Sequence, residues 1–478
     1  MTLTISSLVY ALIVCFLFHI VGKWNRKYTL AVASLIYIFF INPLAGIYVL
    51  ASSFVCFFAG VIIQRYRKEK RTRVASFICY ISVAFFALSL LLLKYFPVYY
   101  PEQLRQENVL KYIVMPVGFS FYIFQAISYV IDVNRGKVSA AKNPVNIILY
   151  LAYFPKFVSG PIIRYPDFKA ELAVIRRKTK FREPMRWKRA LYYTLVGCFM
   201  KLVIADRLSD YISRLFEGYE NYGSLLLLMG SLFYTIQIYC DFAGYSYVAK
   251  GISLMYGIEI CENFKQPYCS SNITEFWRRW HMSLSRWFVD YLYIPLGGNR
   301  KGEARKIINT MIVFLVCGMW HGAGINFIVW GLLHGIFSAI DTIARDKGLN
   351  SLRSGAAGHI IAFAEASFAW IFFRASSFSS GVGYIRAMLG NGLQLGTISE
   401  QLERLELISP EPWIIVIMIV IMIVFDVIAY RKDRHLPELL AELPQGRRYL
   451  CFYFLFMIVV VFGIYGPDLG VKPIYMGF

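Results

Sequence analysis

The sequence predicts an all-α, polytopic membrane protein, and two observations lead to this fold class. Hydrophobic residues make up 58% of the 478 residues, whereas soluble domains average roughly 45–50%. Several apolar segments approach the roughly 17–25 residues with which a helix crosses a bilayer. Counting such segments predicts roughly a dozen spans, which we assign to one membrane domain over residues 1–478. The clearest are Thr4–Gly22, Val74–Leu93, Pro412–Tyr430 and Leu450–Ile464.

The N-terminal third is expected to form successive helices. The first apolar segment lacks a basic leader and a small-residue cleavage site, so it is interpreted as a retained helix rather than a signal peptide. Residues 29–63 are long enough for two crossings, and Asn42-Pro43 is the expected break between them. Val74–Leu93 then crosses outward, and residues 111–133 return.

Two later segments are apolar but interrupted. Asn143–Phe168 contains several prolines and suits a re-entrant element, whose backbone must be enclosed by protein or line a cavity because lipid offers no hydrogen-bond partners. Ile307–Ile340 is too long for one untilted helix and is split by "GMWHGAG" at Gly318–Gly324. It is predicted to form two arms that meet at His321, deep in the membrane. Further spans are expected at Trp187–Ala205, from Ser224 onward, and at Ile360–Phe373.

The excess of basic residues, 50 Lys and Arg against 29 Asp and Glu, indicates membrane orientation rather than nucleic-acid binding. These residues are concentrated in short loops between apolar segments, with clusters at residues 65–73 and 176–189. By the positive-inside rule both loops face the cytoplasm, where they contact anionic lipid. Counting spans from these loops places the N-terminus, the acidic loop at residues 395–411 and the C-terminus outside.

The six histidines include the strongest candidates for chemistry, because ionisable groups within spans are costly and rare. His321 is flanked by Trp320 and by glycines that allow helices or a substrate to approach closely. The alternative is a neutral imidazole that hydrogen-bonds between helices. His281, in "RRWHMSLS", fits an interfacial role and a functional role equally well. His334 lies on an arm of the predicted hairpin that contains His321, and it is a candidate for a residue that supports His321 without contacting the substrate.

Histidine suits acyl transfer, since its unperturbed pKa of about 6.5 lets the neutral ring take a hydroxyl proton and later return it. The sequence has no GxSxG, HExxH or P-loop motif, which argues against hydrolase, zinc-enzyme and nucleotide-hydrolysing classes. The nine cysteines are scattered without a CxxC pair, so neither a metal site nor a disulfide framework is expected. These features favour a membrane group transferase, and the chemistry alone leaves the transferred group open.

Four sequence blocks carry a resemblance to a known family: Tyr153–Tyr165, Cys240–Ser246, Ile273–Gly302 and Cys317–Gly335. In order and spacing they resemble the membrane-bound O-acyltransferases, and more narrowly the bacterial branch concerned with alginate O-acetylation. "RRWHMSLS" followed by "DYLYIPLGGNR" is the most specific block. The matching core lies at about residues 143–342. The resemblance implies a bundle of tilted helices around a central funnel.

The resemblance also implies roles for individual residues. His321 matches the near-invariant catalytic histidine of the family, and His281 matches a second position that holds His, Asn or Asp. Trp320, His334 and Asp290 are candidates for supporting these two histidines. The arginines and tryptophans around His281 are expected at the cytoplasmic lip of the funnel, with His321 at its constriction.

By the same resemblance, an acetyl group is expected to pass from a cytoplasmic thioester across the membrane to an extracytoplasmic polysaccharide. Acetyl-coenzyme A is the first candidate donor, an acyl carrier protein thioester is the alternative, and no metal is implied. The expected partner is an SGNH-type esterase-like protein, and the expected location is the bacterial cytoplasmic membrane. Export of D-alanyl groups to teichoic acid is one alternative. A transporter of lipid-linked sugars is another, although the sequence shows no internal repeat of the kind common in transporters.

The C-terminal tail, residues 466–478, ends in "VKPIYMGF" and is aromatic rather than charged. Two interpretations stay open. Tyr and Phe favour the headgroup zone, which suits an interfacial anchor. Related acetyltransferases end in a similar Ile-Tyr-x-x-Phe string, which suits a covalent relay. In the second interpretation Tyr475 carries the acetyl group, and His321 is the general base for its phenol.

Overall fold

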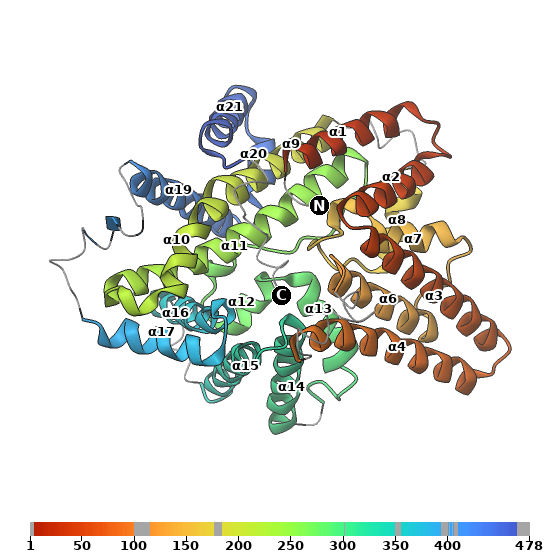
Figure 1. The fold of residues 1–478 in the computed structure, drawn as a ribbon. Coiled ribbons are helices and arrows are strands. Elements are labelled where there is room, and N and C mark those ends of the chain that lie inside the picture. Colours follow the sequence, from red (N-terminus) through yellow and green to blue (C-terminus); the bar gives the residue numbers. More distant parts are fainter. Residues whose placement is uncertain are drawn as a thin grey trace, which may run out of the picture. The chain divides into compact units, whose positions relative to one another are not determined.

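The computed structural model describes residues 4–99, 115–175, 184–300, 302–348, 355–392, 400, 402–403, 405 and 410–465. Every regular element in this part of the chain is a helix (Figure 1), which confirms the all-α class. Seven of the helices are long and apolar enough to cross a membrane, and Ile5–Ile20 is a shorter apolar helix. The seven are Pro43–Lys68, Thr72–Tyr99, Ser224–Met255, Ile325–Asp346, Gly355–Arg374, Glu411–Arg431 and Gln445–Phe462.

The chain folds as two compact units, Met1–Leu191 with Ala249–Glu262 and Tyr192–Val248 with Asn263–Phe478. The single membrane domain expected over the whole chain stays a prediction, as does the count of a dozen spans. The helices that belong wholly to the first unit are α1 (Ile5–Ile20), α2 (Arg26–Ile41), α3 (Pro43–Lys68), α4 (Thr72–Tyr99), α6 (Phe119–Asn134), α7 (Pro144–Ala152), η2 (Phe154–Lys156) and α8 (Tyr165–Val174).

The predicted break at Asn42 separates α2 from α3. Asn42 Oδ1 accepts a hydrogen bond from the amide of Ala45 at 2.8 Å, and Pro43 occupies the first helical position. Asn at this position satisfies a backbone donor that the helix leaves free, and the first position tolerates the missing amide of Pro. Two helices therefore meet at the predicted break. Of these, α3 is long and apolar enough to cross a membrane, and a crossing by α2 stays a prediction.

The proline-rich segment at residues 143–168 forms no span. It consists of the short helix α7, one turn of 3₁₀-helix and irregular backbone that leads into α8. Protein encloses it, because Tyr150 and Phe154 are fully buried, and the Tyr150 hydroxyl donates a hydrogen bond to the carbonyl of Ile163 at 2.8 Å. Irregular backbone with internal partners agrees with the expected interrupted element.

The second unit contains the remaining helices, and α9 and α11 have residues in both units. The Arg-rich stretch that holds His281 forms two short helices, α12 and α13. The remaining helices are α9 (Pro184–Cys198), the π-helix η4 (Phe199–Ala205), α10 (Asp206–Glu217), η5 (Tyr219–Asn221), α11 (Ser224–Met255), η6 (Pro267–Cys269), α12 (Ile273–Arg279), α13 (Met282–Phe288), the π-helix η7 (Val289–Tyr293), α14 (Glu303–His321), α15 (Ile325–Asp346), α16 (Gly355–Arg374), α17 (Phe378–Gly390), α19 (Glu411–Arg431), α20 (Leu436–Glu442) and α21 (Gln445–Phe462).

The helices α14 and α15 form the predicted hairpin and lie side by side (Figure 1). Glycines make this packing close. A Cβ atom on Gly318 would lie 2.4 Å from the carbonyl oxygen of Phe327, and one on Gly331 would lie 2.3 Å from that of Phe314. Such distances are far below van der Waals contact, so only glycine lets the two backbones meet here. Because α14 ends at His321, the prediction of two arms that meet at this residue is confirmed.

Candidate active site

His321 lies at the apex of the α14–α15 hairpin and is only 4% exposed. Three aromatic rings surround it. The ring centroid of His321 is 4.6 Å from Trp320, 4.8 Å from Trp330 and 5.1 Å from Phe373, each in an edge-to-face arrangement. His321, the strongest candidate from the sequence, therefore lies in a buried and mostly apolar setting. Hydrogen bonds and electrostatic interactions are stronger there than in water.

His281 joins α12 to α13 and is 1% exposed. Its backbone φ of 41° lies in the left-handed region, which is unfavourable for a residue with a Cβ atom. Strained conformations of this kind persist where their surroundings fix them, and they cluster at functional sites. Here the fixing group is Asn263, whose carbonyl oxygen accepts a hydrogen bond from the amide of Met282 at 2.9 Å.

The side chain of Asn263 also fixes the imidazole of His281. Asn263 Oδ1 accepts from the amide of Ser283 at 3.3 Å and from its hydroxyl at 2.8 Å, and it lies 3.1 Å from His281 Nδ1. A backbone amide only donates, so the Asn263 atom in this position is the oxygen. His281 Nδ1 must then carry the hydrogen. Its Nε2 is therefore the basic nitrogen of the neutral ring.

Burial lowers the pKa of His281 to about 3, so its ring is neutral near physiological pH. Trp320 lies between the two candidate histidines in the network of rings. Its centroid is 6.4 Å from that of His281 and 4.6 Å from that of His321. The structure thus brings the rings of His281, Trp320 and His321 into one cluster, and the catalytic roles expected for the two histidines stay predictions. Asn263 was not identified from the sequence, and no motif marked it.

The other predicted residues take different places. His334 is fully buried on α15, and its ring centroid lies 5.0 Å from Trp330, which contacts His321. Asp290 is half-buried on η7. Tyr475 and the rest of the tail fall outside the described residues, so the relay and the anchor both stay predictions.

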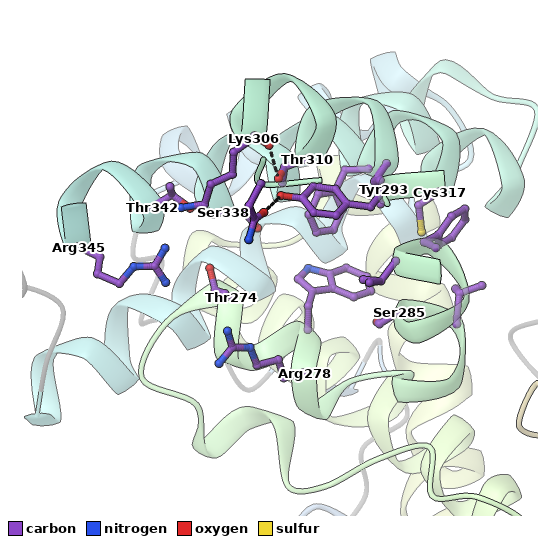
Figure 2. Close-up of a pocket in the computed structure, with 17 residues that line it drawn as sticks. Thr274, Arg278, Ser285, Tyr293, Lys306, Thr310, Cys317, Ser338, Thr342 and Arg345 are labelled. Carbon is purple, nitrogen blue, oxygen red and sulfur yellow. Dashed lines mark hydrogen bonds between the residues drawn. The ribbon is translucent and has the colours of Figure 1, made fainter. Parts of the chain in front are cut away.

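A cavity of about 380 Å³ lies between α12, α13, η7, α14 and α15. One face of α14 lines it with Lys306, Thr310, Phe314 and Cys317, and one face of α15 lines it with Ser338, Thr342 and Arg345. Figure 2 shows Arg345, Lys306 and Arg278 towards one end and Cys317 towards the other. The cavity is therefore basic at one end, lined by hydroxyl groups in its middle and more apolar at the other end.

The inner end of this cavity approaches His321 along α14. Lys306 and Cys317 are about 16 Å apart along the helix axis, and His321 follows Cys317 by one turn, or about 6 Å. A second hollow of about 550 Å³ shares Thr274, Arg278 and Arg345 with the first. It adds Lys265 and Arg279, together with the carboxylates of Glu275 and Asp341. The two hollows together suit a ligand with an anionic head and a long arm that extends towards His321.

Comparison with known proteins agrees with this geometry. Residues 76–346, more than half of the chain, match the family model described as MBOAT, membrane-bound O-acyltransferase family. The chain is 38% identical over 286 residues to the probable alginate O-acetylase AlgI of Pseudomonas putida, which covers 59% of this chain and 57% of that protein.

Two further relatives have other names. The chain is 32% identical over 320 residues to the peptidoglycan O-acetyltransferase of Helicobacter pylori, which covers 61% of this chain and 60% of that protein. It is 28% identical over 230 residues to the teichoic acid D-alanyltransferase of Bacillus subtilis, which covers 46% of this chain and 57% of that protein. The matched region therefore spans less than two thirds of each of these relatives.

Proposed function

Since the chain belongs to the membrane-bound O-acyltransferase family and is a multi-pass membrane O-acyltransferase, we propose that it transfers an acetyl group to hydroxyl groups of a polysaccharide. Higher identity to the alginate and peptidoglycan O-acetylating relatives than to the D-alanyltransferase supports acetyl as the group. Family membership in an enzyme class sets aside the transporter hypothesis.

The observation that carries the proposal is the cavity that follows the hairpin towards His321. Its basic end suits phosphate groups, which Lys and Arg bind by charge and hydrogen bonds. Its length suits a phosphopantetheine arm, and both acetyl-coenzyme A and an acyl carrier protein present their thioester on such an arm. We take acetyl-coenzyme A as the donor, because Arg278, Lys306 and Arg345 line the cavity and can meet its phosphate groups. Lys306 and Arg345 also form ion pairs with Asp346.

In the proposed reaction His321 removes the proton from the acceptor hydroxyl, and the hydroxyl oxygen attacks the thioester carbonyl carbon. The carbonyl electrons move to oxygen and return as the carbon–sulfur bond breaks. The departing thiolate takes the proton from His321, so an ester and a free thiol result. His281, with its basic Nε2 fixed by Asn263, positions the donor or relays the proton.

The acceptor and partner complete the proposal. We place the acceptor on the extracytoplasmic side and the donor at the cytoplasmic end of the hairpin, because Lys306 and Arg345 lie at that end and basic loops favour the cytoplasm. An SGNH-type protein then finishes the transfer to the polysaccharide. The location is the bacterial cytoplasmic membrane.

The test is the His321→Ala variant. It is expected to insert into the membrane at a normal level and to abolish O-acetylation of the surface polysaccharide, measured as ester content by mass spectrometry. His359→Ala is the matched control, since His359 lies on α16 and contacts only Tyr430 among the described ring pairs. A normal ester content in His321→Ala would overturn the proposed function.

A second assay identifies the donor. Purified protein in vesicles, together with the proposed SGNH-type partner, is given labelled acetyl-coenzyme A or the same label on an acyl carrier protein, and ester formation on added glycan is followed. Transfer from the carrier protein alone would contradict acetyl-coenzyme A while leaving the acetyltransferase intact. Transfer of D-alanyl in place of acetyl would favour the alternative function.

A further inference from the structure

Two buried hydrogen-bond donors lie on α15 without an acceptor among the described residues. They are the indole Nε1–H of Trp330 and Nε2 of the His334 ring. Both side chains have an exposed fraction of 0%, and their positions differ by four residues, so they stand one helical turn apart on one face.

The hydrogen on His334 can be assigned from its neighbour. The indole Nε1–H of Trp277 lies 3.3 Å from His334 Nδ1. An indole nitrogen only donates, so Nδ1 is the acceptor, and the hydrogen of the neutral ring lies on Nε2. The ring is enclosed by aromatic side chains, including Phe276, Phe314 and Trp370, which supply no acceptor of ordinary strength.

A buried donor without an acceptor costs roughly 1–3 kcal/mol. Native proteins contain few such groups, and a functional role is one of the accepted reasons for keeping one. The described residues include other buried donors of this kind, among them Trp370 Nε1, so burial alone does not assign a role. Trp330 and His334 differ in that they stand one turn apart on α15 and the ring of Trp330 contacts that of His321, which points to an anionic or strongly accepting oxygen that arrives with the substrate.

The place of the two donors identifies that oxygen. The ring of Trp330 lies 4.8 Å from that of His321 and 5.0 Å from that of His334. The next turns of the same helix face carry Ser338, Thr342 and Arg345, which line the cavity assigned to the donor. The two hydrogen-bond donors therefore lie between the cavity proposed for acetyl-coenzyme A and the general base His321. The thioester carbonyl must be held in this region for the reaction.

We propose that Trp330 Nε1–H and His334 Nε2–H donate hydrogen bonds to the thioester carbonyl oxygen and stabilise its negative charge in the tetrahedral intermediate. This inference rests on the proposed function. As the hydroxyl oxygen of the acceptor bonds to the thioester carbon, the π electrons of the carbonyl group move to the carbonyl oxygen. When the carbon–sulfur bond breaks, the charge leaves with the thiolate, which takes the proton from His321. Trp277 is the positioning residue that keeps the hydrogen on His334 Nε2.

Two neutral donors in a site that excludes water are an effective means of catalysis. Fixed donors aimed at developing charge act in a medium of low polarity, and the protein need not reorganise during the reaction. Removal of one donor from an oxyanion hole costs roughly 100-fold to 1000-fold in kcat. The two buried donors, which are costly in the resting protein, therefore become favourable only as the reaction proceeds.

The first test is Trp330→Phe, which removes the N–H group and keeps an aromatic ring. It is expected to lower kcat about 100-fold and to leave KM for acetyl-coenzyme A nearly unchanged. The matched control is Trp370→Phe. Trp370 is equally buried, its ring centroid lies 5.6 Å from that of Trp330, and its indole nitrogen is also a buried donor without an acceptor among the described residues, but it lies on α16 rather than α15. Equal activity in the two variants would overturn the inference.

The second test separates the role of His334 from packing. His334→Gln retains an oxygen that accepts from Trp277 and an NH₂ group that donates, so it is expected to keep much of the activity. His334→Phe lacks both groups and is expected to lose it. If His334→Phe fails to fold, the decisive variant is Trp277→Phe, which leaves His334 in place and frees its tautomer. Full kcat in Trp277→Phe would contradict the assignment of the His334 hydrogen.

A spectroscopic readout does not depend on turnover. In the inactive His321→Ala protein, bound acetyl-coenzyme A with an isotope-labelled carbonyl is observed by infrared difference spectroscopy. Hydrogen bonds from Trp330 and His334 are expected to shift the carbonyl stretch to lower frequency, and addition of Trp330→Phe should reverse part of the shift. If wild-type protein transfers acetyl but the carbonyl stretching frequency is the same with and without Trp330→Phe, only the inference about Trp330 and His334 fails. If wild-type protein transfers no acetyl from any donor, the proposed function fails as well.

Discussion

Asn263 Oδ1 lies 3.1 Å from His281 Nδ1, and this contact determines which ring nitrogen of His281 carries the hydrogen. The same oxygen accepts from the amide and the hydroxyl of Ser283, while Asn263 Nδ2 donates to the hydroxyl of Ser246 at 3.3 Å. Asn263 therefore connects the "CDFAGYS" block on α11 with the "RRWHMSLS" block around α12 and α13. These two blocks were recognised separately in the sequence, and one asparagine between them joins them.

The first prediction concerns this asparagine. Asn263→Leu removes the acceptor and is expected to lower kcat roughly 10- to 100-fold, towards the lower end of what acid–base groups contribute. Asn263→Asp keeps an acceptor and adds a negative charge, which raises the pKa of His281 from its depressed value of about 3. As the pH falls through that raised pKa the ring becomes charged, so activity that needs its neutral form is lost at low pH and recovered at higher pH.

The measurement is the pH dependence of kcat in wild type, Asn263→Leu and Asn263→Asp. Wild-type protein is expected to show no loss from His281 across the neutral range, because its pKa lies far below it. An unchanged profile in Asn263→Asp would show that His281 takes no part in the chemistry.

The second prediction tests the side chain of His281 directly. His281→Asn is expected to retain part of the activity, because an amide still hydrogen-bonds and the family resemblance implies that Asn is tolerated at this position. His281→Leu is expected to lose nearly all of it, since leucine offers neither a donor to Asn263 Oδ1 nor a basic nitrogen. Ester formation by the two purified variants is compared at equal membrane levels. Equal activity in both would mean that this side chain only packs.

Much of the hairpin could be predicted from the sequence, for a physical reason. An apolar run too long for one helix, interrupted by three glycines around His321, leaves few arrangements other than two close-packed arms. The break at Asn42 is equally local, since an N-cap and a proline define it within four residues. Local rules of this kind need no knowledge of the remaining fold.

The supporting groups could not be predicted in the same way. Asn263 lies 18 residues before His281, and nothing in their spacing reveals that a left-handed residue lies between α12 and α13. The pairing of Trp277 with His334 spans 57 residues and depends on how α12 packs against α15. The cavity proposed for the donor likewise arises from faces of several helices, each of which alone would be interpreted as an ordinary amphipathic or apolar helix.

The third prediction concerns the basic end of the cavity. Arg278 is exposed and lines both hollows. If it binds a phosphate group of the donor, Arg278→Ala should raise KM for acetyl-coenzyme A about 10-fold, equivalent to about 1.4 kcal/mol, with kcat retained. The KM of wild-type protein should also rise with ionic strength. Arg386→Ala is the control, because Arg386 is an exposed residue of α17 that lines neither hollow. If KM for acetyl-coenzyme A changes neither in Arg278→Ala nor with ionic strength, a phosphate site at this end of the cavity is contradicted.

The fourth prediction concerns the close packing of the hairpin. Gly331→Ala places a Cβ atom 2.3 Å from the carbonyl oxygen of Phe314, so α14 and α15 must separate. Overpacking of this kind costs about 1–3 kcal/mol, and the displacement of His321 should lower kcat further. Thermal unfolding of the purified protein is compared with Gly390→Ala, where a Cβ atom meets nothing within 4 Å. Equal stability of the two variants would mean that the backbones adjust without cost.

The last prediction concerns Tyr475 in the C-terminal tail. A covalent relay requires its phenol oxygen to attack the acyl carbon, with His321 as base, because a phenol with a pKa of about 10 attacks slowly at neutral pH. Tyr475→Phe keeps the ring, and so the anchor, and removes the nucleophile. The relay predicts loss of polysaccharide acetylation with normal membrane insertion, together with an acetylated tail peptide that mass spectrometry detects in wild-type protein when the acceptor is withheld. Tyr465→Phe serves as a control for loss of a hydroxyl group near the tail. Full acetylation in Tyr475→Phe would eliminate the relay, leave the aromatic anchor as the role of the tail, and require the acceptor hydroxyl itself to reach His321.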